Sequence, residues 1–314
     1  MARRSSQTGY GIRIAARAAI GLVAVSVLAF LIIRALPSDP VTLAIQAWNL
    51  PATDEVIRDL RRAWGLDRPL PLQYLGWLGR FVLGDWGTSF RTGAPIADEF
   101  LRRLPLSFGI GVGGLVLAAL LAVPIGYRAA CKPGGWIDRF SRLLAVGAQA
   151  VPVFWLGLIL LWLLAVKWRL MRPFADHPGT IALAIALVAF ASLGPLARVY
   201  RRALIEVEHQ PFFRTALAKG LSREQALWRH GGRHALYALL ASLRAEAGWA
   251  IGGTATVEVL IGLPGISQFL VQSIAARDYF VLQAHVMVVA IWMIAMNASV
   301  GLLHCRLDPR IDGA

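Results

Sequence analysis

Long uninterrupted runs of apolar residues constrain the fold of this chain more than any other feature. Each of six runs has about 19–25 residues, and a helix of about 20 residues, rising 1.5 Å per residue, crosses a hydrocarbon core of about 30 Å. Barrel strands would instead alternate apolar and polar residues over about ten positions. The sequence therefore predicts an all-α polytopic membrane protein with six transmembrane helices. The expected spans are Ala15–Ile33, Leu106–Tyr127, Leu143–Val166, Ile181–Val199, Leu239–Leu263 and Val281–Leu303.

Composition agrees with a membrane protein and excludes a secreted disulfide scaffold, a disordered tail and an average cytosolic enzyme. The chain is 57% hydrophobic and 16% charged, against about 45–50% and about 25% in globular domains. Its net charge of +14 invites a nucleic-acid partner, but the 29 arginines and 3 lysines lie between the apolar runs. We therefore expect no nucleic acid. Two cysteines, Cys131 and Cys305, are too few for a disulfide framework or a thiolate metal site.

Arginine placement predicts the orientation. The N-terminus and the connections 128–142 and 200–235 are basic, whereas the connection 37–104 carries eight basic and eight acidic residues. Basic loops stay in the cytoplasm, so both termini are expected there. The basic 167–180 connection disagrees mildly with this orientation. The first run is too long for the h-region of a signal peptide and lacks a small-residue cleavage site, which favours an uncleaved helix.

The external connection 37–104 is too long for a simple link between helices. Thr53 is expected to cap a helix that ends at Gly65, and a turn is expected at Gly84–Gly87. Such an element either receives an external partner or covers the membrane helices, and the pattern leaves both open. The apolar stripe of the expected helix consists of Val56, Ile57, Leu60 and Trp64.

The connection 200–235 predicts two short basic helices joined at a glycine. Pro211 suits the first turn of a helix over Phe212–Lys219, and Gly220 is expected to end it in a left-handed conformation. Ser222 and Gln225 form a capping-box pattern for a second helix, expected to end at Gly231-Gly232. The pair is shaped to dock on a cytoplasmic partner; the alternative is a loop lying on lipid headgroups.

The segment Arg214–Ser222 resembles the EAA loop of importer-type ABC permeases. It is similar to the R-T-A-x-A-K-G-L form found in the dipeptide/oligopeptide/nickel permease family, and further motifs of that family follow in order over nearly the whole chain. These motifs are Leu36–Pro40, Gly65–Pro69 with Gln73-Tyr74, Gly84–Ser89, Val151–Gly157, Gly252-Gly253, Val257-Glu258, Pro264–Ile266, Arg277–Tyr279 and Asp308–Arg310.

The resemblance implies a type I ABC importer permease core in the bacterial plasma membrane. It implies a first helix with an external loop over 1–103, a five-helix core over 104–303 with its coupling loop at 200–235, and a cytoplasmic tail over 304–314. The implied partners are a second permease of the same family in a heterodimer, two cytoplasmic ATPases, an external solute-binding protein and membrane lipid. No catalytic residue, cofactor or metal is implied, and ATP hydrolysis is expected on the partner subunits.

Two groups of residues follow from the matched motifs. The residues expected to couple the chain to an ATPase are Arg214, Thr215, Ala216, Lys219, Gly220 and Ser222. Those expected to contact the binding protein or form a gate are Asp39, Asp67, Asp85, Glu258, Arg277 and Asp278.

The chain departs from the family pattern at several positions. Tyr237-Ala238 replaces Leu-Pro after the second short helix, and Gly301 and His304 replace an aspartate and a tyrosine. Arg244 and Glu246 stand where the family is mostly apolar. A late start of the fifth helix would place these two charges near the cytoplasmic interface; the alternative is an internal cavity.

Function divides into two hypotheses. The first is a permease that imports a dipeptide, an oligopeptide or a nickel chelate, with residues 49–55 resembling nickel-type members. The alternative is a membrane sensor or assembly factor without transport, which would not retain an ATPase on purification. The sequence has no Walker A, H-E-x-x-H or G-x-S-x-G pattern, so we expect neither ATP binding nor hydrolysis on this chain.

Overall fold

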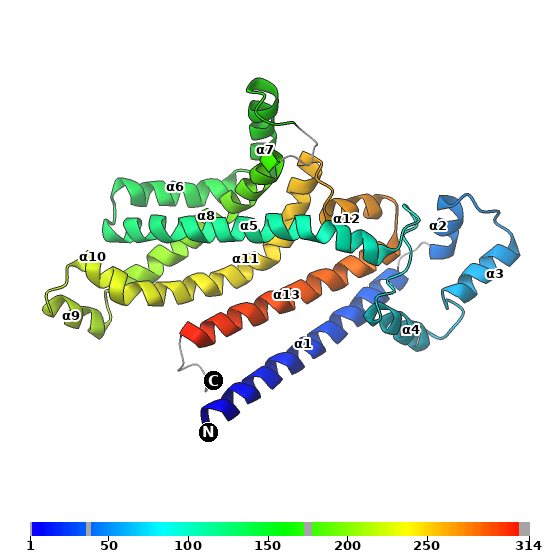
Figure 1. Cartoon of the computed structure of the whole chain (residues 1–314), viewed down its shortest axis with the longest axis horizontal. Helices are drawn as coiled ribbons and strands as arrows, with labels where there is room; N and C mark the ends of the chain where they lie inside the picture. Colours follow the sequence, from blue (N-terminus) through cyan, green and yellow to red (C-terminus); the bar gives the residue numbers. More distant parts are fainter. Residues whose placement is uncertain (1, 36–38, 173–177, 308–314) are drawn as a thin grey trace. The chain divides into compact units, whose positions relative to one another are not determined.

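The computed structural model describes residues 2–35, 39–172 and 178–307, and the regular structure of these residues is helical (Figure 1). One isolated β-bridge joins Thr88 and Pro95. In chain order the helices are α1 (Ala2–Arg34), α2 (Pro40–Ala47), α3 (Asp54–Ala63), α4 (Leu70–Val82), α5 (Ile96–Cys131), α6 (Trp136–Ala150), α7 (Val153–Leu161), the π-helix η1 (Trp162–Lys167), α8 (Pro178–Val207), α9 (Pro211–Ala218), α10 (Arg223–Ala226), the π-helix η2 (Leu227–Gly231), α11 (Gly232–Ile261), α12 (Ile266–Ala275) and α13 (Tyr279–Leu307).

The chain divides into two compact units. The first consists of Met1–Pro105 and Gln268–Ile294, and the second of Leu106–Ser267 and Ala295–Ala314. The first unit therefore combines the N-terminal third with a late segment of the chain. The second holds the helix pair singled out at 200–235.

Four helices in the described part of the chain are long and apolar enough to cross a membrane. They are Ala16–Arg34 of α1, α5, α8, and Tyr279–Gly301 of α13, and each overlaps one of the expected spans. Two further bent pairs of helices qualify when each pair is taken as one span, which gives up to six spans. The class of a helical polytopic membrane protein is thus confirmed.

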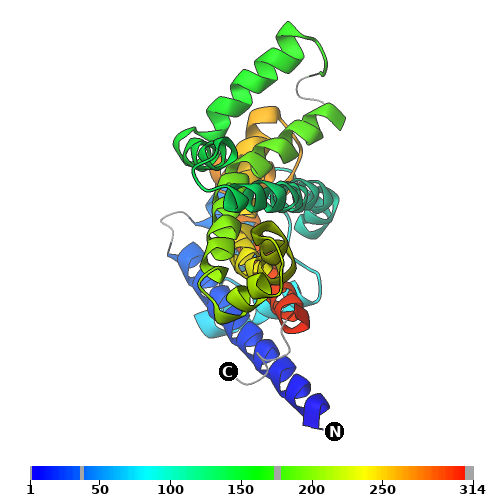
Figure 2. The ribbon, with the colours of Figure 1, turned by 90° about the vertical axis from the view of Figure 1, so that its left-hand side faces the viewer.

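The third expected span, Leu143–Val166, is wrong as a single helix. The structure ends α6 at Ala150, starts α7 at Val153 and bends the pair by 97° (Figures 1 and 2). Pro152 explains the break, because proline lacks an N–H donor and disfavours the helical conformation in the preceding residue. Val151 is accordingly extended, with φ −92° and ψ 117°.

The fifth expected span, Leu239–Leu263, lies on α11, which begins earlier than predicted, at Gly232. The helix stops at Ile261, where Gly262 adopts a left-handed φ of +77°. The segment Gly252–Ile261 and α12 form the second bent pair, with an angle of 82° between them. A helix that starts at Gly232 does not start late, so the argument that placed Arg244 near the interface loses its premise.

Close helix contacts hold the second unit together around α8, which packs against α6 and α11. Gly194 of α8 lies so near α6 that an added Cβ would stand 2.5 Å from the Cα of Ala145. Gly126 of α5 meets the carbonyl of Ala197 in the same way, at 2.8 Å. Small residues commonly permit such approach between membrane helices.

The first unit contains an ordered element between the first two spans. Thr53 caps α3 as predicted, accepting a hydrogen bond from the Val56 amide at 3.4 Å. The expected stripe of α3 is half-buried, while the rest of that helix is exposed. Trp64 of this stripe stacks on Phe90, with ring centroids 5.3 Å apart, and meets Phe280 edge-on. Aromatic packing therefore stabilises a defined fold in this connection.

Candidate functional site

The two short helices expected after α8 are present. Pro211 occupies the first position of α9, which ends at Ala218, one residue before the predicted end. Gly220 has the predicted left-handed conformation, with φ +87°. Ser222 and Gln225 form the complete capping box of α10, with both reciprocal hydrogen bonds. The glycine joint and the caps together fix the angle between the two helices.

This helix pair has a buried side and an exposed side. Phe213, Ala216 and Ala226 face inward and join a core cluster that includes Leu204 and Val207 of α8. The outer side exposes five of the six residues expected to couple to an ATPase, together with two large apolar side chains. The exposed coupling residues are Arg214, Thr215, Lys219, Gly220 and Ser222, and the apolar ones are Phe212 and Leu217. Ala216 differs from the other predicted residues, because it anchors α9 to the chain instead of presenting a surface.

A guanidinium that sequence reasoning missed joins this pair to two long helices. Arg223 donates to the carbonyls of Ala130 and Cys131, the last residues of α5. The same side chain forms an ion pair with Glu208, directly after the end of α8. A cation is favourable at a helix C-terminus because the final carbonyls lack intrahelical donors. Arg223 therefore ties α10 to the ends of α5 and α8.

The predicted end of the second short helix at Gly231-Gly232 is wrong. The backbone stays right-handed through both glycines, so α10 continues through η2 into α11. Close packing explains the first glycine, since a Cβ at Gly231 would lie 3.1 Å from a methyl of Leu204. The outcome matters for function, because α10 is covalently and helically continuous with α11.

A second buried charge cluster near the start of α6 was also missed. The Asp138 carboxylate is fully buried and pairs with Arg142 at 2.7 Å and with Arg201 of α8 at 2.6 Å. It also accepts a hydrogen bond from the Gly134 amide at 2.7 Å. The cluster fixes the turn before α6 against α8.

Three of the residues expected at a binding-protein contact or gate lie in the ordered element between the first two spans, and two of them have local roles. Asp39 caps α2 through the Val41 amide and forms an ion pair with Arg61 at 2.9 Å. Asp85 accepts a hydrogen bond from the Gly87 amide at 3.1 Å within the predicted turn. Asp67 is exposed in the turn after α3. Of these carboxylates, Asp67 and Asp85 are exposed.

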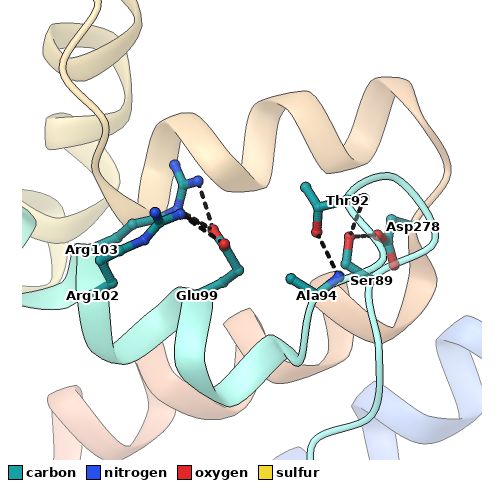
Figure 3. Close-up of polar contacts among 7 residues, drawn as sticks. All are labelled: Ser89, Thr92, Ala94, Glu99, Arg102, Arg103 and Asp278. Carbon is teal, nitrogen blue, oxygen red and sulfur yellow. Dashed lines mark hydrogen bonds and ion pairs between the residues drawn. The ribbon is translucent and has the colours of Figure 1, made fainter.

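Asp278 and Arg277 lie together before α13, with opposite environments. Asp278 is fully buried and accepts a hydrogen bond from the Ser89 hydroxyl at 2.6 Å (Figure 3) and another from the Arg91 amide at 3.3 Å. Burial raises the pKa of its carboxyl above the ordinary value, and the hydrogen bonds only partly offset this effect. Arg277 is exposed and holds an unusual left-handed φ of +55°. The arrangement presents the arginine and conceals the carboxylate.

Beside this cluster, Glu99 holds two arginines of α5 (Figure 3). Its carboxylate pairs with Arg102 at 2.7 Å and Arg103 at 2.6 Å. Arg103 also lies over the Phe269 ring, with its guanidinium carbon 4.8 Å from the ring centroid. These contacts join α5 to the segment that begins at Gln268 within the first unit.

Glu258 lies at the bend between α11 and α12 and is fully buried. Its carboxylate accepts a hydrogen bond from the Ser267 amide at 3.0 Å, near the start of α12. Gly265 approaches so closely that an added Cβ would stand 2.2 Å from a Glu258 carboxylate oxygen. The residue thus fixes the bend, and its carboxylate is not presented on the surface of the chain.

The two charges at departures from the family pattern each have a polar partner on a neighbouring helix. Arg244 donates to the Asn297 side chain at 3.1 Å, and Glu246 accepts from the Ser192 hydroxyl at 2.8 Å. Arg244 is exposed and Glu246 is half-buried. Hydrogen bonds of this kind reduce the cost of polar groups within helix bundles.

Several membrane-spanning helices, together with a capped helix pair attached to their ends, define the transport permease class, and comparison with known proteins gives the family. The model of the binding-protein-dependent transport system inner membrane component matches residues 122–313, and the model of its N-terminal part matches residues 9–111. The chain belongs to this family. It is a permease of the ABC importer type, a multi-pass membrane protein that serves transport rather than catalysis.

Curated relatives match over nearly their full lengths. The chain is 32% identical to the oligopeptide transport system permease protein AppB of Bacillus subtilis, over 93% of this chain and 95% of that protein. It is also 32% identical to the glutathione transport system permease protein GsiC of Pectobacterium atrosepticum, over 92% and 94%. A probable peptide ABC transporter permease protein of Sinorhizobium fredii is 29% identical over 91% and 94%.

Proposed function

We propose that this chain imports small peptides as one of two different permease subunits, together with two cytoplasmic ATPases and an external solute-binding protein. The observation that carries the proposal is the similarity to oligopeptide and glutathione permeases over more than nine-tenths of each chain. In this arrangement both termini and the helix pair at 200–235 face the cytoplasm. The excess of arginine in those segments supports that orientation.

The exposed side of α9 and α10 is the surface proposed to contact an ATPase. Phe212 and Leu217 are 44% and 41% exposed there, beside the basic residues Arg214 and Lys219. Apolar side chains flanked by charges are typical of a protein contact. Thr215 and Ser222 complete the polar rim of this surface, and Gly220 sets its shape.

Movement of the ATPases would reach the membrane helices through two connections. The continuity of α10 with α11 gives one path, and Arg223 gives the other by holding the ends of α5 and α8. When ATP closes the ATPases, these helix ends move together, and the population shifts from an inward-open to an outward-open state. The chain itself supplies binding contacts and no chemistry on the solute.

The external element is proposed to receive the loaded binding protein. Asp67, Asp85 and Arg277 are its exposed candidate contacts, whereas the buried Asp278 and Glu258 are proposed to hold the backbone that a gate would move. A nickel chelate is the second candidate solute, because residues 49–55 resemble nickel-type members. The names of the curated relatives favour the peptide.

Uptake by the reconstituted complex tests the proposal. The chain is co-expressed with the second permease, the ATPases and the binding protein of its transport system, purified, and placed in proteoliposomes that contain ATP. We expect the ATPase to co-purify and uptake of a labelled tripeptide to exceed uptake of a nickel–histidine chelate. Faster nickel uptake would replace the peptide by the metal chelate. A chain that retains no ATPase would favour the sensor or assembly-factor hypothesis.

A further inference from the structure

A cavity of about 250 Å³ lies between α3 and α4 in the first unit, and its charged lining residues are all arginines. Arg62 comes from α3, Arg68 from the turn and Arg80 from α4, with Trp64, Leu72 and Gln73 between them. The Gln73 amide shapes the turn by donating to the carbonyls of Leu66 at 3.1 Å and Arg68 at 2.7 Å. The lining contains no carboxylate side chain.

The three arginine side chains of this cavity are exposed and form no ion pair with the described part of the chain. The neighbouring Arg61 shows the contrast, because it pairs with Asp39 at 2.9 Å. Three guanidinium groups around one cavity repel one another unless an anion lies between them. Guanidinium forks match the oxygens of a phosphate in particular.

The helix α4, which lines this cavity, packs on a candidate membrane span of α1. The Tyr74 hydroxyl lies 2.8 Å from the Ser26 hydroxyl, and the Trp77 ring lies 6.1 Å from that of Phe30. Ser26 and Phe30 belong to the candidate span Ala16–Arg34. At 1.5 Å per residue they stand about 12 Å and about 6 Å before its end, so α4 packs on the half of the span that ends at Arg34. Leu72 and Arg80 of α4 line the cavity.

Large apolar side chains on α4 and directly after it are unusually exposed and lie beside Arg80 in the sequence. The exposed fractions are 51% for Leu70, 53% for Leu72, 61% for Leu75, 75% for Val82 and 86% for Leu83. A short helix with exposed leucines, arginines beside them and Trp64 and Trp77 nearby has the composition of a segment that lies in a membrane interface. Water would be a poor solvent for this surface, whereas acyl chains would cover it.

We infer that this cavity binds the phosphate of an anionic phospholipid, whose acyl chains lie along the exposed leucines of α4. Arg62, Arg68 and Arg80 hold the headgroup, and Gln73 keeps the turn open around it. A free phosphate or an acidic loop of a partner protein would satisfy the arginines but leave the leucines uncovered. The bound lipid fixes α3 and α4 against the membrane at the end of α1. This lipid site is independent of the solute and of the ATPase contact.

Native mass spectrometry of the purified full-length chain tests the site. Phosphatidylglycerol and phosphatidylcholine are titrated separately into the detergent-solubilised protein, and the bound lipids are counted. The double variant Arg68→Gln/Arg80→Gln removes two headgroup contacts. The matched control Arg58→Gln/Arg172→Gln removes two exposed arginines that do not line the cavity, so both variants have the same net charge.

We expect the wild type to prefer phosphatidylglycerol and the cavity variant to bind it at least tenfold more weakly, since each arginine near an anionic surface contributes about fivefold. The control should bind within about twofold of wild type. Equal losses in both variants would overturn the inference.

Two further measurements distinguish the other occupants. Inorganic phosphate that displaces phosphatidylglycerol from the wild type at stoichiometric concentration would show a free-anion site and overturn the lipid. Unchanged lipid binding in the cavity variant, with lost contact to the binding protein, would reassign the arginines to a protein partner. Weaker phosphatidylglycerol binding in Leu72→Ser/Leu75→Ser, with circular dichroism unchanged, would support the role of the acyl chains.

Discussion

Gly220→Val should separate the chain from its ATPase while leaving it in the membrane. Gly220 connects α9 to α10 with φ +87°, and its amide closes the turn on the Leu217 carbonyl at 2.9 Å. A valine at this φ is a strained outlier, because its branched Cβ crowds the backbone. The relaxed valine backbone would swing α9 away from its present angle to α10.

The structure sets the magnitude of this effect. No atom lies within 4 Å of a Cβ built on Gly220, so the substitution creates no side-chain clash and its cost is confined to the backbone. That cost is about 1–2 kcal/mol for a residue with a Cβ, and larger for a β-branched one. Since about 1.4 kcal/mol is a factor of ten, the docking geometry should lose at least about tenfold in population. Global stability of about 5–15 kcal/mol would survive the change.

Gly84→Val is the matched control for this experiment. Gly84 has φ +89° and likewise has no atom within 4 Å of a built Cβ, but it follows α4 and is remote in sequence from the helix pair. Membrane insertion, ATPase co-purification and ATP-dependent uptake are measured for both variants and for Gly220→Ala. We expect ATPase recovery to fall from wild type to Gly220→Ala to Gly220→Val, and to stay unchanged in Gly84→Val. Full recovery and uptake in Gly220→Val would refute the coupling role of this joint.

Three other predictions follow from the contacts. Arg223→Met should lower the yield of transport per ATP hydrolysed by about tenfold, because hydrogen bonds to a charged group contribute about 1.5–3 kcal/mol. Arg223→Lys should lower this yield less. Equal yields in the wild type and both variants would contradict the prediction. Burial raises the pKa of the Asp278 carboxyl, so the contribution of this group to stability is fully present below its unfolded pKa and is lost as pH rises through its folded pKa. Asp278→Asn should therefore flatten the plot of melting temperature against pH between these two pKa values. An unchanged slope there would contradict the prediction. Leu60→Cys and Thr215→Cys, in a chain freed of its native cysteines, should react with an impermeant maleimide from opposite sides of the membrane, and labelling from one side would overturn the predicted topology.

Local sequence signals predicted the elements that depend on local chemistry. Thr53, Ser222 and Gln225 act as caps because their side chains satisfy backbone donors a few residues away, and this requires no knowledge of the rest of the chain. Gly65 and Gly220 were predictable for the same reason, since only the local backbone decides a left-handed turn. Of the six spans that the apolar runs predicted, four are continuous helices in the described part of the chain.

Interruptions and continuations of helices depended on context that hydropathy does not report. Pro152 lies inside an apolar run, and a hydropathy window does not register its missing donor, so two bent helices were predicted as one. At Gly231 and Gly232 the opposite error occurred, because one continuous helical stretch was predicted to end there. Glycine both ends helices and permits close packing, and the nearness of Leu204, which only the tertiary structure provides, selects the second role.

The sequence could not predict the contacts that hold the helix pair α9 and α10 and the start of α6 in place, because these contacts join residues that are far apart in the chain. Arg223 is 92 residues from Cys131, and Asp138 is 63 residues from Arg201. A charge pattern cannot indicate which of 32 basic residues meets which carbonyl or carboxylate. The matched family motif gave the exposed residues of the pair and the buried Ala216, but Arg223, which holds the pair to α5 and α8, came only from the structure.

The contacts of Arg223 and the continuity of α10 with α11 would let the exposed side of α9 and α10 pass a movement to the membrane helices, although the charges on that side are exposed. Exposed ion pairs contribute only about 0–1 kcal/mol each, so Arg214 and Lys219 alone could not pull a membrane helix. Arg223 instead bonds to the chain's own helix ends, where its partners are partly buried, and α10 continues into α11 without a break. A displacement of α9 therefore reaches α5, α8 and α11 through contacts that do not depend on the strength of the outer surface. The inner anchors should accordingly be less tolerant of substitution than Arg214 and Lys219, the basic residues proposed to face an ATPase.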